Sequence, residues 1–443
     1  MYSNMRTKSA FVVCAVAFVL FCAATQGIAG TGPSSVWTVE DGIRQEGGWP
    51  AVNSILQLSD GSYRSYNADA SPYSGYYPVI INSWISADGL AWTKETNLLI
   101  GGPSYWAGSP EVIVLPDGRL RMYFENERYP FGTPEWGHIL SAISDDGLTW
   151  TIEPGVRIEY GGPYDDPRAI GANIFKLDDG RLRMYYSGYD GSHYRILSAV
   201  SEDGLAWTKE DGVRVDVGGP DDILHASGSH VMQVPDGRYF MFYFGSSRDW
   251  SGCILSAVSS DGLTWEKESG CRIVPQDLQG GPYSLVSPGA LVKLSDYEYR
   301  MYFAADRYPW IFAGNRIVTL SAVGRITPLD KTPPTLTLSV SPGMLWPPNH
   351  KMVTVTPVIS VNDNLDAAPQ VKLLSITSSE LDNGLGDGDT ANDIVINADN
   401  TISLRAERSG KGGGRVYTIT YQATDSAGNS TTASAIVAVP HNK

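Results

Sequence analysis

A seven-residue motif that recurs at a nearly constant spacing constrains the fold of this chain more than any other feature. The motif reads Ser-x-Asp-Gly-x-x-Trp, and its four copies end at tryptophans that lie 58, 57 and 58 residues apart: Trp92, Trp150, Trp207 and Trp265. A fixed period of this length indicates one supersecondary unit that is copied several times. The chain is therefore best interpreted as an array of repeats.

Three further signals recur in step with the motif and predict antiparallel strands. A Gly-Gly pair opens each repeat, an apolar strand follows, and a turn such as Asp117-Gly118 leads into a second strand. Asp-Gly between β-rich runs favours a tight hairpin, because glycine tolerates the positive φ that the turn needs. A third strand runs into the motif and a fourth begins at its Trp. Each repeat is thus a four-stranded meander with the size of a propeller blade.

The fifth repeat stops after Val323 without a copy of the motif. The missing strand is found near the N-terminus, where residues 37–44 match residues 207–214 almost residue for residue. We predict that this N-terminal strand completes the last blade, because closing the ring removes an exposed sheet edge. The predicted fold of residues 30–330 is an all-β, five-bladed β-propeller closed by the N-terminal strand.

The ends of the chain predict a signal peptide and a second domain. Residues 1–29 contain a short apolar run after Arg6 and Lys8, as in a secretory signal peptide. Residues 331–334, Lys-Thr-Pro-Pro, have the composition of a stiff linker. Residues 335–443 contain short Val/Ile/Thr-rich runs between turn residues, which predicts an antiparallel β-sandwich. We therefore expect a secreted, two-domain protein.

The charge and the apolar content of the chain exclude several partners. The formal net charge of −15 repels phosphate backbones, so we expect neither nucleic acid nor an anionic membrane as a partner. No segment is apolar enough to predict a membrane span. We expect a monomer.

Cys253 and Cys271 lie symmetrically about Gly262 of the fourth motif. If that motif is a hairpin turn, the two cysteines face each other across adjacent strands. A secreted protein can keep such a bridge oxidised, so we predict a disulfide. The alternative is a pair of buried free thiols.

A possible calcium loop lies in the second domain. Asp387, Asp389 and Asp393 carry oxygen ligands of the kind that calcium prefers. They lack a full twelve-residue loop, so a solvated turn is the favoured interpretation. No metal and no cofactor is predicted.

The loops that lead into the first strands suggest a ligand site. When the repeats are aligned on their hairpin turns, Ser54, Glu111, Asn173 and His230 occupy the same position. Different polar groups at one position favour a ligand site, because a purely structural repeat would tend to reuse one residue. The loops between the second and third strands are aromatic and charged, which suits sugars. The alternative is a soluble rim that covers the core.

The repeats resemble the arabinanase/levansucrase/invertase superfamily, which includes glycoside hydrolase family 43. The resemblance covers residues 35–330 and rests on five four-stranded blades with Ser-x-Asp-Gly-x-x-Trp turns. It implies three carboxylates on the first strands: Asp, Asp and Glu in blades one, two and three. Here blade one has none, blade two offers Glu111, and blade three offers Asp165 or Asp166. The family triad is therefore not intact.

A glycosidase needs one protonated and one ionised carboxyl group on opposite sides of the scissile bond. As a hypothesis, Glu111 is the acid and Asp166 the base or nucleophile. Burial beside a like charge would raise the pKa of one of them. The alternative is that each carboxylate caps backbone amides. The residues predicted to bind substrate are Trp106, Arg168, Asn173, His225, His230, Trp250 and Tyr308.

The sequence leaves two classes of function open. The first is a secreted enzyme that acts on a poly- or oligosaccharide, and the second is a non-catalytic carbohydrate-binding or surface-interaction propeller. Sialidases are a further resemblance, since their repeated turns are similar and three arginines grip their substrate; Arg168, Arg248 and Arg307 would be the candidates here. Six blades in sialidases, against five here, make this interpretation weaker. Residues 418–429 resemble bacterial immunoglobulin-like modules, which implies a role in spacing or attachment.

Overall fold

The structure is a computed structural model that describes residues 34–46, 52–70, 79–98, 100, 107–126, 137–247, 252–306, 317–383, 390–399 and 401–442. These residues divide into two compact units, with the boundary between Leu329 and Asp330. The predicted signal peptide, residues 1–29, lies outside the described residues. Among the described helical turns, none is long and apolar enough to cross a membrane.

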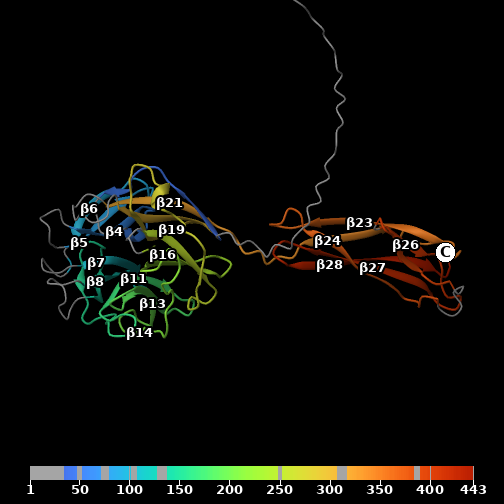
Figure 1. The fold of residues 1–443 in the computed structure, drawn as a ribbon, viewed down its shortest axis with the longest axis horizontal. Helices are drawn as coiled ribbons and strands as arrows, with labels where there is room; N and C mark the ends of the chain where they lie inside the picture. The colour runs from blue at the N-terminus through green and yellow to red at the C-terminus, as the bar shows by residue number, and fades with distance from the viewer. Residues whose placement is uncertain are drawn as a thin grey trace, which may run out of the picture. The chain divides into compact units, whose positions relative to one another are not determined.

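In the unit of residues 34–329 the described strands pair antiparallel within each sequence repeat; repeats 1 and 2 each form a four-stranded sheet, and the strands of repeats 3 to 5 are joined in one 13-stranded sheet (Figure 1). Repeat 1 is β3 (Val52–Gln57), β4 (Tyr63–Ala70), β5 (Val79–Ser86) and β6 (Thr93–Leu98). Repeat 2 is β7 (Ala107–Val114), β8 (Leu120–Asn126), β9 (His138–Ser144) and β10 (Thr151–Ile152). Repeat 3 is β11 (Arg168–Lys176), β12 (Leu182–Tyr189), β13 (Tyr194–Ser201) and β14 (Thr208–Lys209).

Repeat 4 is β15 (His225–Gln233), β16 (Tyr239–Ser246), β17 (Gly252–Ser259) and β18 (Glu266–Lys267). Repeat 5 is β19 (Leu285–Ser295), β20 (Glu298–Asp306), β21 (Ile317–Ile326) and β1 (Ser35–Val39), with β2 (Gln45–Glu46) also paired to β21. Apart from the 3-10 turn η1 (Pro275–Asp277), the described residues form strands, turns and loops. The predicted all-β class is confirmed.

The N-terminal strand β1 takes the fourth place in repeat 5. It pairs antiparallel with β21, with Trp37 opposite Gly324. Just after β1, Glu40 accepts two hydrogen bonds from Arg300, at 2.8 and 2.9 Å. In repeat 2, Glu153 directly follows the fourth strand and accepts the same two bonds from Arg121, at 2.8 and 2.9 Å. The predicted pairing of the two distant segments is therefore present.

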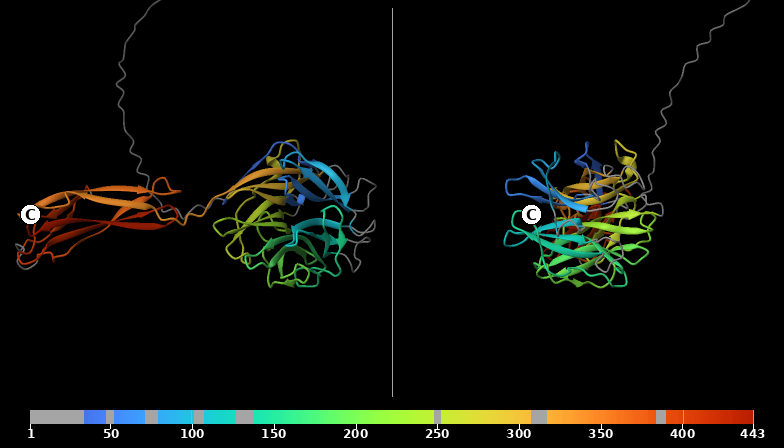
Figure 2. Two further views of the ribbon diagram at one scale, coloured as in Figure 1. Left: turned by 180° about the vertical axis from the view of Figure 1, so that it is seen from behind. Right: turned by 90° about the vertical axis from the view of Figure 1, so that its left-hand side faces the viewer.

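The first strands of the five repeats contact one another in a cycle. β3 contacts β7, β7 contacts β11, β11 contacts β15, β15 contacts β19, and β19 contacts β3. In the right-hand view of Figure 2 the colours of this unit follow one another around its centre in chain order. One end of each first strand therefore lies near the same end of its neighbours.

An aromatic contact joins each repeat to the next. A ring on the second strand of one repeat meets the edge or face of a tryptophan in the neighbouring repeat, with centroids 5.0 to 5.9 Å apart and planes at 82° to 86°. Edge-to-face pairs of this kind contribute about 0.5–1.5 kcal/mol beyond their burial. The pairs are Tyr66–Trp150, Tyr123–Trp207, Tyr185–Trp265, Phe242–Trp37 and Tyr302–Trp92.

The repeated motif is a turn held by its own side chains. Asp146 accepts hydrogen bonds from the amides of Leu148 (2.8 Å) and Thr149 (2.7 Å), which lower its pKa to about 2. Ser144 accepts the amide of Gly147 at 2.8 Å. The hydroxyl of Tyr66 in the preceding repeat donates to the Gly147 carbonyl at 3.1 Å. The motif is therefore a structural joint between repeats.

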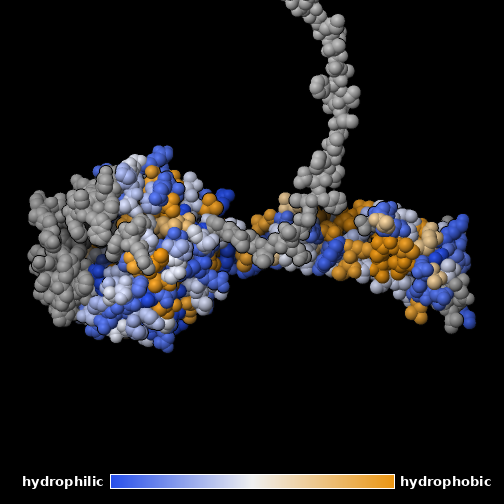
Figure 3. All heavy atoms as spheres, in the orientation of Figure 1, coloured by the Kyte–Doolittle hydropathy of each residue, from blue (hydrophilic) through white to orange (hydrophobic). Residues whose placement is uncertain are grey.

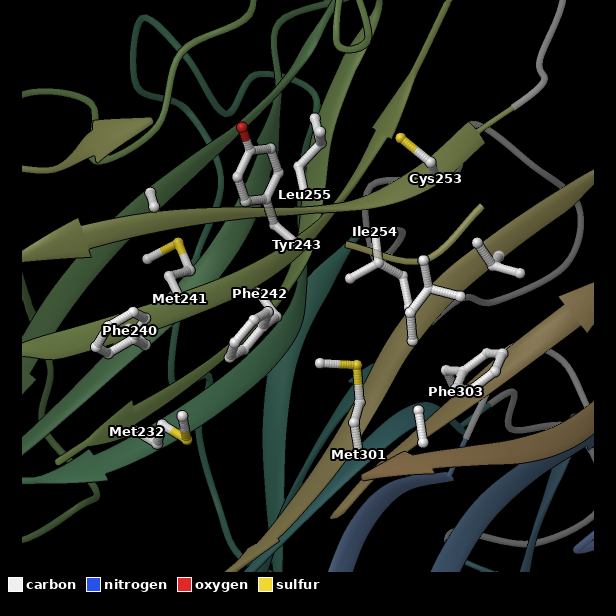
Figure 4. Packing of buried hydrophobic residues seen from close by; sticks show 14 of the residues in the cluster. Met232, Phe240, Met241, Phe242, Tyr243, Cys253, Ile254, Leu255, Met301 and Phe303 are labelled. Atoms are coloured by element: carbon white, nitrogen blue, oxygen red, sulfur yellow. The ribbon is translucent and has the colours of Figure 1, made fainter. Parts of the chain in front are cut away.

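The largest core cluster lies between repeats 4 and 5 (Figure 4), where Phe240, Phe242, Met301 and Phe303 are all fully buried. The disulfide between Cys253 and Cys271, with Cα atoms 5.9 Å apart, lies at this cluster, and the predicted bridge is confirmed.

The unit of residues 330–442 contains two antiparallel sheets that share one core. The first sheet is β22 (Thr335–Ser341), β23 (Met352–Asn362), β26 (Ile402–Arg405) and β25 (Ile394–Ile396). The second sheet is β24 (Gln370–Ser378), β27 (Gly414–Thr424) and β28 (Ser430–Pro440). Buried residues from both sheets meet in the core, among them Val355, Leu404 and Ile419. Apolar side chains also gather on the visible face of this unit in Figure 3.

A buried ion-pair network lies beside this core. Arg415 is fully buried and pairs with Asp393, which also accepts a bond from Arg405 at 3.1 Å. Asp393 thus pairs with two arginines. Asp387 and Asp389 of the suspected calcium loop lie outside the described residues.

Candidate functional site

Three of the four polar residues that share one position on the first strands connect neighbouring repeats. Ser54 accepts the amide of Val112 at 3.0 Å, and Asn173 accepts the amide of Val231 at 2.9 Å. Between them, Glu111 accepts the amide of Ile174 at 3.2 Å. Three different side chains thus perform the same task in successive repeats. Their variety has a structural explanation in addition to the predicted ligand role.

Glu111 is the buried member of the predicted catalytic pair. Its side chain lies on β7, is only 8% exposed, and accepts a second hydrogen bond from Asn173 Nδ2 at 3.1 Å. Burial raises the pKa of Glu111 to about 8, and the two hydrogen bonds oppose that shift. At neutral pH this carboxyl group therefore holds a proton that it could donate. His230 is also buried, and burial lowers its pKa to about 4, because it disfavours the charged imidazolium.

The two aspartates before β11 have different environments. Asp165 is buried and accepts bonds from Gly162 N (2.7 Å), Lys209 Nζ (2.5 Å) and Tyr186 OH (3.0 Å). Asp222 repeats all three contacts in the next repeat, so Asp165 belongs to the shared framework. Asp166, the predicted base, is exposed.

Arg168 and His225, both predicted to bind substrate, are brought together by a tyrosine. Arg168 Nη1 donates to the hydroxyl of Tyr194 at 2.9 Å. The Tyr194 ring stacks on Tyr189 at 4.6 Å and lies 5.2 Å from the ring of His225. Burial and then the neighbouring His193 lower the pKa of His225 to about 4, so its imidazole is neutral at pH 7. Arg168 and His225 are the first residues of β11 and β15.

Glu125 lies at the same end of the unit; the sequence placed it in one of the charged and aromatic loops between second and third strands, but not among the predicted site residues. Ser109 Oγ donates to Glu125 Oε1 at 3.1 Å, while Oε2 is buried and has no hydrogen-bond partner among the described residues. Burial raises the pKa of Glu125, and the charge of Arg168 opposes that shift. A Cβ atom on Gly108 would clash with this carboxylate, so the neighbouring strand leaves room for it.

A signal for Glu125 is present in the aligned repeats. The other repeats carry Ala68, Ser187, Phe244 and Ala304 at its position, so only repeat 2 has an ionisable group there. Its partner Ser109 has φ of 44°, a left-handed conformation, where the next two repeats have glycine, Gly171 and Gly228. A non-glycine residue in this conformation costs about 1–3 kcal/mol and is common at functional sites.

The remaining predicted site residues cannot be placed. Trp106, Trp250 and Tyr308 lie outside the described residues, as do Arg248 and Arg307 of the sialidase comparison.

Comparison with known proteins finds distant similarities. Searched against models of protein families, the chain matches none. An uncharacterised protein of Mycobacterium tuberculosis is 29% identical over 213 residues, which cover 42% of this chain and 66% of that protein. An extracellular endo-α-1,5-L-arabinanase of Thermotoga petrophila is 26% identical over 211 residues, which cover 44% of this chain and 38% of the arabinanase. The chain thus matches less than two thirds of the length of these relatives.

The similar solved structures include glycoside hydrolases of family 43. A thermostable family-43 enzyme has a TM-score of 0.47 at 18% identity, covering 66% of this chain and 97% of its own. An α-L-arabinofuranosidase from Lactobacillus brevis has a TM-score of 0.46 at 15% identity, covering 62% of this chain and 90% of its own.

Proposed function

We propose that this chain is a secreted, monomeric glycan-acting protein, in which residues 30–330 form a closed five-bladed propeller and residues 335–443 an immunoglobulin-like domain. The cyclic contacts of the five first strands, and the aromatic contacts that include Phe242–Trp37 and Tyr302–Trp92, support the closed propeller. The distant similarity to an extracellular arabinanase supports a glycan as the ligand.

The observation that carries the proposal is the cluster of Glu125, Arg168, Tyr194, Tyr189 and His225. It joins carboxylate, guanidinium and imidazole groups to stacked aromatic rings at the end where the first strands begin. Aromatic faces stack on the C–H faces of sugars, while the polar groups exchange hydrogen bonds with hydroxyls. We name this set the glycan cluster.

In the catalytic version of the proposal, Glu111 donates a proton to the leaving oxygen and Asp166 is the ionised base or nucleophile. The raised pKa of Glu111 suits an acid that must hold its proton at neutral pH. The exposure of Asp166 suits a carboxylate that stays ionised. Both carboxyl groups are required in this scheme.

The alternative is a propeller that binds glycans without cleaving them. The hydrogen bonds of Glu111 to Asn173 and Ile174 favour it, because a residue that joins two repeats need not take part in chemistry. In this version Asn173 and His230 support the wall of the site, and the glycan cluster makes the contacts.

One paired experiment tests both versions. The protein is applied to a glycan array and, separately, incubated with arabinan and other plant and microbial polysaccharides while released sugar is measured. Release that Glu111→Gln and Asp166→Asn each abolish supports the enzyme, with the exposed turn variant Asp117→Asn as control. Binding without release of sugar supports the binding protein. The absence of both binding and release would contradict the proposal.

A further inference from the structure

Three carboxylates converge in the unit of residues 330–442, which does not contain the glycan cluster. Asp330 is the first residue of this unit, Asp363 directly follows β23, and Asp425 directly follows β27. One oxygen from each lies within 4.8 Å of one oxygen from each of the others. Three like charges this close repel one another unless a cation or protons lie between them.

The Asp363 carboxylate adds a second, independent observation. Its Oδ1 accepts the amides of Leu365 (2.9 Å) and Asp366 (2.8 Å). Its Oδ2 is buried, yet it accepts no hydrogen bond from any described residue. A buried carboxylate oxygen without a partner is costly, because it has lost its water and gained nothing in exchange. The free oxygen therefore indicates a ligand that the protein itself does not supply.

Asp425 and Asn429 give the cluster a fixed geometry. Asp425 is only 6% exposed and accepts bonds from Asn429 N (2.8 Å) and Asn429 Nδ2 (2.9 Å). The same Nδ2 also donates to the Asp330 carbonyl at 3.1 Å. Asn429 thus orients one carboxylate and fixes the segment that carries another, as residues around metal ligands do.

We propose that Asp330, Asp363 and Asp425 bind a calcium ion. All three donors are hard oxygen atoms, which calcium prefers, and calcium accepts the irregular arrangement that three loops provide. The three oxygens all lie within 4.8 Å of one another, which is close enough for one calcium ion to bind all three. Asp330 and Asp363 are partly exposed, so water can complete the coordination shell.

This site differs from the one that the sequence suggested. Asp393 of that loop pairs with Arg405 and Arg415, whereas the three carboxylates proposed here come from segments far apart in the chain. A bound ion would tie the start of the unit to the ends of β23 and β27. We therefore expect calcium to stabilise this unit against unfolding.

The test is calcium titration of the full chain after dialysis against a chelator. Calorimetric titration should show one calcium per chain, and differential scanning calorimetry should show an unfolding transition that calcium shifts to higher temperature. Asp363→Asn should weaken binding by at least about tenfold, a loss typical of altered metal sites. Asp399→Asn, at an exposed turn of the same unit, is the matched control and should bind like the wild type.

A second variant and a measurement of folding keep the test decisive if Asp363→Asn alters folding. Asn429→Ala leaves all three carboxylates in place and should also weaken calcium binding, while circular dichroism reports the fold of each variant. Absence of calcium binding by the wild-type chain would overturn the proposal. So would equal binding of magnesium, or unchanged calcium binding by a folded Asp363→Asn variant.

Discussion

The two ends of the repeats differ in what they conserve from one repeat to the next. At the turn end, the motif around Trp150 is copied in four repeats, with the same hydrogen bonds and the same aromatic contact each time. At the other end, Glu125 and Arg168 have no counterparts of the same type in the neighbouring repeats. The turn end is therefore a structural joint between repeats, and the other end carries the candidate site.

Variation between repeats is not sufficient evidence of function, however. Ser54, Glu111 and Asn173 differ chemically and still accept the same kind of backbone amide from the next repeat. Glu125 also receives a backbone amide from the next repeat, that of Gly171, but its Oε2 is buried without a hydrogen-bond partner among the described residues. An unused buried donor or acceptor is therefore a better guide to a site than variation alone.

The largest effect should come from the turn end. Trp150→Ala removes the contact with Tyr66 and leaves a cavity, so it should lower the unfolding free energy by about 3–5 kcal/mol. Urea denaturation measures the loss, and Trp150→Phe should lose less. Glycan binding per folded molecule should stay unchanged. A loss of glycan affinity in the folded variant would contradict the conclusion that the turn end has only a structural role.

A smaller effect should follow from removing the disulfide, which only repeat 4 carries among the described residues. The double change Cys253→Ser and Cys271→Ser opens a loop with a sequence separation of 18 and should cost about 3 kcal/mol. Thermal denaturation with and without reductant measures it. Reductant should destabilise the wild type and leave the double variant unaffected, whereas equal sensitivity would contradict a structural bridge.

The sequence predicted the strand pairing of the repeats, because repetition carries that information. The period, the Asp-Gly turns and the match of residues 37–44 to residues 207–214 predicted the repeats and the pairing of β1 with β21. The disulfide followed from the same register.

The candidate site was harder to predict, because burial and hydrogen bonding between strands are not visible in a single sequence. Asp165 looked like a possible catalytic group, yet it is held by Lys209 and Tyr186. Glu125 lies near the end of a second strand, and the sequence marked only its loop as suited to sugars, because the burial of this one carboxylate is not visible in the sequence. Trp106, Trp250 and Tyr308 remain predictions.

A further effect should appear in the pH dependence of stability. The folded pKa of Glu111 is about 8, above the usual value of 4.5. The folded state therefore binds this proton more tightly than the unfolded chain, so the stability that it contributes is full below about pH 4.5 and is lost as pH rises to about 8. Glu111→Gln should flatten this slope in urea titrations between pH 5 and pH 8. An unchanged slope would contradict a raised pKa at this residue.

We propose that the varied end of the repeats, and not the uniform end, contacts a glycan. The most direct measurement is calorimetric titration of wild type, Glu125→Gln and Asp117→Asn with the oligosaccharide that binds best on the array. We expect about tenfold weaker binding for Glu125→Gln, the cost of disturbing one hydrogen bond to the ligand, and unchanged binding for Asp117→Asn. Equal affinity of all three proteins would contradict it.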